Sequence, residues 1–202
     1  MSKRSHTPYN RTSILAILAL TALLALLVAG CGKDDAGGEG SPPPNYKKAL
    51  AGAPPKLAAL YDQADQLLPG GQDAFDARID ELKGHPVVVN IWGSWCGPCI
   101  LEFPHFQEAS AKLGKRVAFL GVNSQDNEDA AETLLRDYPV PYPSYVDPDR
   151  DITFDLDATH GLPATAFYDA EGDLTFTKSG AYSSADEIEE DIRLHAMGDE
   201  SG

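Results

Sequence analysis

Two of the three cysteines in this 202-residue chain, Cys96 and Cys99, are separated by two residues. Such a pair can bind a metal ion or cycle between a dithiol and a disulfide. A structural zinc site needs four ligands, usually with a second CxxC or a close histidine pair, and the chain has neither. The histidines beyond the N-terminal region are scattered singly: His85, His105, His160 and His195. The spacing therefore favours redox chemistry, and we expect no metal site.

The cysteine pair lies at the junction between a predicted strand and a predicted helix. Residues 87–92 are almost continuously apolar and β-branched, which is typical of a strand buried on both faces. Residues 99–113 then predict a helix. Unpaired N–H groups at a helix N-terminus stabilise a thiolate, which is the nucleophilic form of cysteine. We therefore expect Cys96 to attack a substrate disulfide and Cys99 to resolve the mixed disulfide, with the Gly-Pro dipeptide between them suited to a helix start.

The remaining hydrophobic pattern predicts an α/β domain. Residues 117–122 form the next buried strand, so that strand, helix and strand make a βαβ unit with parallel strands. Residues 164–168 and 173–178 predict an antiparallel hairpin, because only a tight turn separates them. Helical spacing of apolar residues predicts helices over residues 57–68, 74–82, 128–138, 152–156 and 185–197. The sum is a mixed central sheet flanked by helices, with an N-terminal helical extension.

Residues 87–104, VVVNIWGSWCGPCILEFP, resemble the active-site segment of the thioredoxin superfamily. Within that superfamily they are similar to the extracytoplasmic, membrane-anchored TlpA/ResA-type disulfide reductases. Residues 161–165, GLPAT, match a second motif of that group, and the resemblance extends over residues 75–197. It implies a thioredoxin fold and thiol–disulfide exchange through the cysteine pair, without a cofactor.

The same resemblance implies a substrate groove. In that family the proline of the second motif, Pro163 here, is cis and faces the CxxC across the groove. The backbone of Leu162 would then be free to pair with an extended substrate peptide. Trp95 would form a wall of the groove, and the alternative for this residue is an aromatic side chain of the core. Gly97 and Pro98 complete the expected groove.

Two positions near the cysteines bear on proton transfer. Thioredoxins place a buried Asp six residues before the first motif cysteine, where this chain has Asn90, and an amide cannot take a proton. The membrane-anchored group instead resembles this chain in having a Glu three residues after the second cysteine, here Glu102. A partly buried carboxyl group would have a raised pKa and could take the proton of the resolving thiol, whereas the alternative is a solvated helix residue. Pro104 matches the kink proline of the thioredoxin active-site helix.

The N-terminal residues have the features of an export signal. Three basic residues precede or flank the start of an apolar run over residues 14–29, which is short for a membrane-spanning helix. The end of this run, Val28-Ala29-Gly30-Cys31, resembles the lipobox of bacterial lipoproteins. We therefore expect a lipoprotein signal peptide over residues 1–30 and lipidation of Cys31, with an uncleaved anchor as the alternative. Either arrangement places the domain outside the cytoplasm and attached to the cell membrane.

The rest of the chain divides by composition. Residues 31–53 are rich in Gly, Pro and acidic side chains and predict a flexible tether. Residues 54–197 then form one thioredoxin-like domain of ordinary size, followed by a tail over residues 198–202. Beyond residue 30 the chain has 13 basic and 31 acidic side chains, a net charge of −18. This acidity argues against nucleic acid as a partner and against a basic membrane-binding face.

We therefore expect an extracytoplasmic thiol–disulfide oxidoreductase that reduces exported proteins, such as apocytochrome c, and receives electrons from an upstream donor in the membrane. A thiol peroxidase shares the fold, but it would need a Pro and a Thr or Ser where the chain has Val89 and Gly93. A copper-binding assembly factor of this fold would need a wider cysteine spacing and a well-placed His. These two activities are the alternatives.

Two further features have structural interpretations. Residues 147–151 begin like a calcium loop, but Ile152 and Ala158 stand where a Gly and a bidentate Glu are needed. We expect this segment to form a turn and a helix cap. His160 lies close to the second motif, and we expect a surface or capping role for it.

Overall fold

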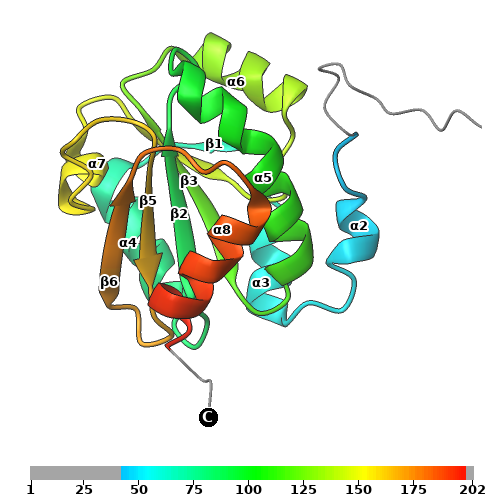
Figure 1. Ribbon diagram of the computed structural model, residues 1–202. Helices are drawn as coiled ribbons and strands as arrows, with labels where there is room; N and C mark the ends of the chain where they lie inside the picture. The colour runs from blue at the N-terminus through cyan, green and yellow to red at the C-terminus, as the bar shows by residue number, and fades with distance from the viewer. Residues whose placement is uncertain (1–41, 199–202) are drawn as a thin grey trace, which may run out of the picture. The chain divides into compact units, whose positions relative to one another are not determined.

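The computed structural model describes residues 42–198, which contain a six-stranded mixed sheet (Figure 1). The strand order is β1-β4-β3-β2-β5-β6, in which the first four strands are parallel, β5 is antiparallel to β2, and β6 is antiparallel to β5. The strands are β1 Leu67–Leu68, β2 Val87–Trp92, β3 Ala118–Ser124, β4 Ser144–Asp147, β5 Ala164–Tyr168 and β6 Leu174–Ser179. The predicted α/β class, parallel unit and hairpin are confirmed.

Helices cover both faces of this sheet. The helices are α2 Tyr46–Ala49, α3 Pro55–Tyr61, α4 Gly71–Leu82, α5 Gly97–Leu113, α6 Glu128–Asp137, α7 Asp151–Asp155 and α8 Ala185–Asp191, which continues as a π-helical turn η1 over Ile192–Ala196. Helices α5, α6 and α8 share one hydrophobic core, and α3, α4 and α7 share the other. Figure 1 shows α5 and α8 lying side by side across the first face.

Strand β2 sits at the centre of the sheet because its side chains fit both cores. All six of its residues are buried, and alternate side chains point to opposite faces. Val88 and Trp92 enter the core with α5, whereas Val89 and Ile91 enter the core with α4. Each such burial contributes about 1.5–3 kcal/mol, so the strand is held firmly on both sides. The same alternation turns Asn90, an amide in an apolar run, toward α5.

The structure differs from the prediction in two segments, one that follows α3 and one that follows α6. The predicted helix over residues 57–68 is wrong at its end: α3 stops at Tyr61, and Leu67–Leu68 pairs with β4 as a parallel strand. The chain leaves the helix because Asp65 adopts a left-handed conformation, with its carboxylate accepting a hydrogen bond from the Val140 amide at 2.6 Å. Strand β4 was not predicted, because the proline-rich residues before it obscure the pattern.

The folded region also extends into the predicted tether over residues 31–53. Helix α2 lies within that range, capped by the Asn45 side chain, which accepts a hydrogen bond from the Lys48 amide at 3.0 Å. The Tyr46 hydroxyl donates to the Pro139 carbonyl oxygen at 2.9 Å and so attaches this helix to the domain. The expected signal peptide and Cys31 lie outside the described residues. Within residues 42–198, no helix is long and apolar enough to cross a membrane.

Candidate functional site

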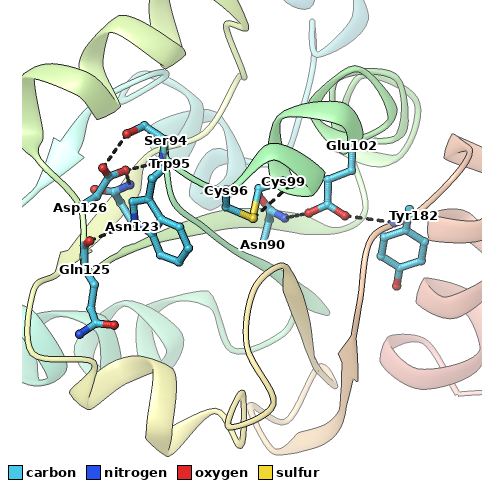
Figure 2. The surroundings of a disulfide bond; sticks show 10 residues. All are labelled: Asn90, Ser94, Trp95, Cys96, Cys99, Glu102, Asn123, Gln125, Asp126 and Tyr182. Atoms are coloured by element: carbon cyan, nitrogen blue, oxygen red, sulfur yellow. Dashed lines mark hydrogen bonds between the residues drawn. A yellow bond between two sulfur atoms is a disulfide. The ribbon is translucent and has the colours of Figure 1, made fainter.

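The two cysteines form a disulfide at the N-terminus of α5 (Figure 2). Helix α5 begins at Gly97, two residues earlier than predicted, so Cys96 is the N-cap residue and Cys99 lies in the first turn. The Cys96 sulfur accepts a hydrogen bond from the Cys99 backbone N–H at 3.3 Å. Cys96 is 4% exposed and Cys99 is fully buried, whereas Gly97 and Pro98 are exposed. The helix N-terminus and this N–H group would stabilise a thiolate on Cys96 once the disulfide is reduced.

Glu102 lies on the buried side of α5, behind the cysteines. Its side chain is fully buried, so the alternative interpretation as a solvated helix residue is wrong. Glu102 Oε1 accepts a hydrogen bond from Asn90 Nδ2 at 2.8 Å, and Oε2 accepts one from the Tyr182 backbone N–H at 3.1 Å. Burial raises the pKa of Glu102 to about 7, and these two hydrogen bonds act in the opposite direction. A carboxyl group with that pKa can both take and release a proton near neutral pH.

Asn90 has a role that the sequence did not indicate. The prediction considered this residue only as the loss of a proton-accepting Asp. In the structure its amide group holds the Glu102 carboxylate from the strand side, and in Figure 2 it lies between the disulfide and Glu102. The second polar atom of this side chain, Oδ1, is buried without a hydrogen-bond partner. An unpartnered buried oxygen is costly, so Asn90 is placed here at the expense of stability.

The predicted groove residues of the second motif lie at the same end of the sheet as the cysteines. Strand β5 is antiparallel to β2, with Ala164 opposite Ile91, so the preceding loop continues beside the end of β2. The Leu162–Pro163 peptide bond is cis, as the resemblance implies. Pro163 is buried and its carbonyl oxygen accepts a hydrogen bond from the Gly180 amide at 2.9 Å. In the described part of the chain, the Leu162 N–H and C=O have no hydrogen-bond partner, which leaves them available to an extended peptide.

Trp95 directly precedes the cysteine pair and is 59% exposed, so the interpretation as a core aromatic is wrong. Its exposed ring is nevertheless fixed in place. The indole Nε1–H donates to the Gln125 carbonyl oxygen at 3.0 Å (Figure 2). The ring also lies directly over Gly93, where an added Cβ would come within 2.7 Å of Nε1. Gly93 is therefore required for the present orientation of the indole.

Asp126 anchors the loop that carries Trp95, a role that no sequence pattern indicated. Its carboxylate accepts hydrogen bonds from both the backbone N–H and the hydroxyl group of Ser94. It also accepts one from Asn123 Nδ2 at 2.7 Å (Figure 2). A further one comes from the Asn127 amide at 2.8 Å. Asp126 directly follows Gln125, so the acceptors of the three hydrogen bonds that hold Ser94 and Trp95 lie on consecutive residues.

We expect the substitution D126N to release the Trp95 loop, because an amide cannot accept hydrogen bonds at both of its terminal atoms. The free energy of unfolding should fall by about 1–2 kcal/mol. In protein labelled with fluorotryptophan, the ¹⁹F resonance of Trp95 should move toward that of a freely rotating indole. The control is D129N, which removes the same charge from the exposed first turn of α6. A ¹⁹F shift of equal size in D129N would contradict the anchoring role.

Three other predicted features are structural. Asp147 accepts hydrogen bonds from the Ile152 amide at 3.2 Å and the Thr153 amide at 2.9 Å, so the calcium-like segment caps α7 as predicted. His160 is exposed, and its ring nitrogen Nδ1 lies 3.4 Å from the hydroxyl oxygen of Thr159. Pro104 lies inside α5, at the position expected for the kink proline.

Comparison with known proteins identifies the family of this chain. The Redoxin family matches residues 51–192. Thiol-disulfide oxidoreductase ResA of Bacillus subtilis (strain 168) is 29% identical over 126 residues, which cover 62% of this chain and 69% of that protein. Thiol:disulfide interchange protein DsbE of Escherichia coli (strain K12) is 30% identical over 173 residues, which cover 81% of this chain and 84% of that protein.

Solved structures show the same fold. A secreted Mycobacterium tuberculosis disulfide oxidoreductase homologous to E. coli DsbE has a TM-score of 0.51 and 25% identity, covering 56% of this chain and 84% of that one. The structure of DsbF from M. tuberculosis has a TM-score of 0.51 and 28% identity, covering 56% of this chain and 82% of that one. The chain belongs to the Redoxin family, has a thioredoxin-like fold, and is related to thiol–disulfide oxidoreductases.

Proposed function

We propose that this protein is an extracytoplasmic disulfide reductase of exported proteins, attached to the cell membrane through a lipidated Cys31. The observation that carries the proposal is the Cys96–Cys99 disulfide at the N-terminus of α5, beside the cis Leu162–Pro163 peptide. The lipobox-like end of the apolar N-terminal run supports the anchor. The acidic composition supports protein partners rather than nucleic acid. An electron donor in the membrane would restore the dithiol after each turnover.

In the first step the Cys96 thiolate attacks one sulfur of a substrate disulfide. The substrate S–S bond breaks, a mixed disulfide with Cys96 forms, and the other substrate sulfur leaves as a thiolate. The position of Cys96 at the helix N-cap supports this role, because the helix N-terminus stabilises the attacking thiolate. The low exposure of Cys99 makes it the less accessible of the two sulfurs.

In the second step the Glu102 carboxylate, held by the Asn90 amide group, accepts the proton of the Cys99 thiol. The Cys99 thiolate then attacks the Cys96 sulfur, and the second substrate sulfur leaves as a thiolate that takes up a proton. The substrate gains two electrons, and the cysteine pair loses the same two as it becomes a disulfide. A pKa of Glu102 about 7 suits this exchange, since the group is partly ionised near neutral pH.

The groove would hold the substrate as an extended peptide. The free backbone groups of Leu162 can form a short β-type pairing with the peptide on one side of the cysteines. On the other side Trp95 presents a fixed aromatic face. Gly97 and Pro98, which follow Cys96, are exposed and would complete the groove.

The direction of the reaction can be tested by the reduction potential of the cysteine pair. We expect a value near the reducing end of the CxxC range, about −270 mV as in thioredoxin, because the Gly-Pro dipeptide resembles that of reducing thioredoxins. The measurement is equilibration of the protein with dithiothreitol buffers of known ratio, with the thiol content determined by alkylation. A potential near about −120 mV, as in strong oxidants, would overturn the reductase assignment and leave the exchange chemistry intact.

A further inference from the structure

A row of polar side chains crosses the sheet beside Glu102. Asn90 on β2 lies directly opposite Thr165 on β5, and Thr165 lies directly opposite Lys178 on β6. Residues directly opposite one another in a ladder share a face, so the three side chains lie on the α5 side of the sheet. Asn90 and Thr165 are buried, whereas Lys178 is half-buried on the edge strand. The row therefore leads from the Glu102 carboxylate to the protein surface.

The buried part of this row brings polar atoms close to Glu102. Asn90 Oδ1 is buried and has no hydrogen-bond partner within the described residues, and the buried Thr165 hydroxyl group lies next to the Tyr182 side chain. A buried polar atom without a partner costs about 1–3 kcal/mol, so Asn90 points to a role beyond stability. These polar atoms also make the surroundings of Glu102 more favourable for a charged group than the apolar core around the rest of α5.

Lys178 lies on Tyr182, the residue that contacts Glu102. The Lys178 ammonium nitrogen is 4.2 Å from the centroid of the Tyr182 ring and 3.4 Å from the Gly180 carbonyl oxygen. The Tyr182 backbone N–H donates to Glu102, and its hydroxyl group donates to Asp191 at 2.8 Å. The ammonium group is therefore held on a side chain whose own backbone binds the carboxylate.

The groups that face Glu102 come from several elements and differ in charge. Cys99 lies on the same helix, and Tyr142, in the segment before β4, is neutral because burial raises the pKa of its hydroxyl group well above the usual value. Asp191 on α8 is separated from Glu102 by the Tyr182 residue. Lys178 carries a positive charge that lowers the pKa of Glu102 and so favours its ionised form.

We propose that Lys178 is a positioning residue of the thiol–disulfide site. Its ammonium group, held on the Tyr182 ring, stabilises the ionised Glu102 carboxylate and so sets the pH above which Glu102 can accept the proton of Cys99. The inference rests on the proposed function, because the charge of Glu102 matters to catalysis only if Glu102 serves the cysteines. It assigns to β6 a part in the reaction, although this strand contributes no residue to the groove.

Loss of the ammonium charge has a defined direction. Without Lys178 the Glu102 carboxylate loses a favourable Coulomb interaction, so its titration midpoint rises. Tyr182 separates the Lys178 ammonium group from the Glu102 carboxylate, and solvent partly screens the two charges. We therefore expect the titration midpoint of Glu102 to rise by about 0.5–1 pH unit. At pH 7 fewer molecules then carry ionised Glu102, and resolution of the mixed disulfide by Cys99 slows about two- to five-fold.

The test compares K178M with K115M in the full-length protein. Methionine keeps the apolar stem on the Tyr182 ring and removes the charge, while Lys115 is an exposed lysine beyond the end of α5. The titration of Glu102 is followed by its ¹³C carboxyl resonance, assigned with E102Q. We expect K178M to raise the midpoint by at least half a pH unit more than K115M does, and K178R to restore it. Equal shifts in K178M and K115M, or no restoration by K178R, would overturn the proposal.

A kinetic measurement separates this proposal from the proposed function. The rate of mixed-disulfide resolution is measured against pH for the wild-type protein, K178M and E102Q. The pH profile of K178M should move upward by the same amount as the Glu102 resonance. If E102Q resolves at the wild-type rate at every pH, the proton-accepting role of Glu102 in the proposed function fails, whatever the resonance shows. If E102Q is slow but the K178M profile is unmoved, Lys178 is not a positioning residue.

Discussion

The substitution C99S should accumulate mixed disulfides with substrate proteins, whereas C96S should accumulate none. Cys96 is the helix N-cap residue and Cys99 lies fully buried one turn further on, so only the former is placed to attack an incoming disulfide. Serine at position 99 leaves the first step intact and removes the sulfur that resolves its product. Serine at position 96 removes the nucleophile, and we expect disulfide reduction to fall by at least about 10³-fold.

The measurement is non-reducing electrophoresis of membranes from cells that express each variant, followed by reduction to release the trapped partners. The double substitution C96S/C99S is the control for nonspecific association. Thermal unfolding of the reduced wild-type protein and both variants establishes that the fold is retained. Equal trapping by C96S and C99S would contradict the assignment of Cys96 as nucleophile, because the two sulfurs would then be equivalent toward substrate.

The parts of this site that could be predicted are those coded by neighbouring residues. The apolar run of β2, the short loop and the start of α5 follow one another directly, so their periodicity alone places the cysteine pair at a strand–helix junction. Alternation along β2 similarly turns Asn90 toward α5. The cis Leu162–Pro163 bond is different in kind: no periodicity indicates it, and only the resemblance to a family implied it.

The parts that could not be predicted depend on pairing between distant segments. Tyr182 contacts Glu102 across 80 positions of sequence, and Asp126 contacts Ser94 across 32. Strand β1 has two residues, too few for any periodic signal, and exists because Leu67–Leu68 finds β4 as a partner. Lys178 reaches the site only through the register of three strands. Local sequence patterns carry no information about such register until the sheet order is known.

The free energy of unfolding of the oxidised protein should contain a contribution from Glu102 that decreases as the pH rises from about 4.5 to above 7. The substitution E102Q should remove this contribution. Burial raises the pKa of Glu102 from 4.5 to about 7 in the folded protein. The folded state therefore binds more protons than the unfolded state across this interval, and the free energy of unfolding falls with increasing pH. The contribution is fully present below the unfolded pKa and is lost as the pH rises through the folded pKa. Its size is about 3 kcal/mol.

The measurement is urea unfolding of the wild-type protein and E102Q at a series of pH values. The difference between their free energies of unfolding is plotted against pH. The difference isolates Glu102 because the other carboxyl groups are common to both proteins. Asp65 is the main such group, since burial raises its pKa to about 6 and its own contribution falls over the same interval. D65N is therefore the matched control. The difference in free energy of unfolding between the wild type and D65N should also fall with increasing pH, but by less, because Asp65 is more exposed to solvent. A flat wild-type-minus-E102Q curve would mean that the pKa of Glu102 is the same in the folded and unfolded protein, and the raised pKa on which its proton-accepting role near neutral pH depends would be contradicted.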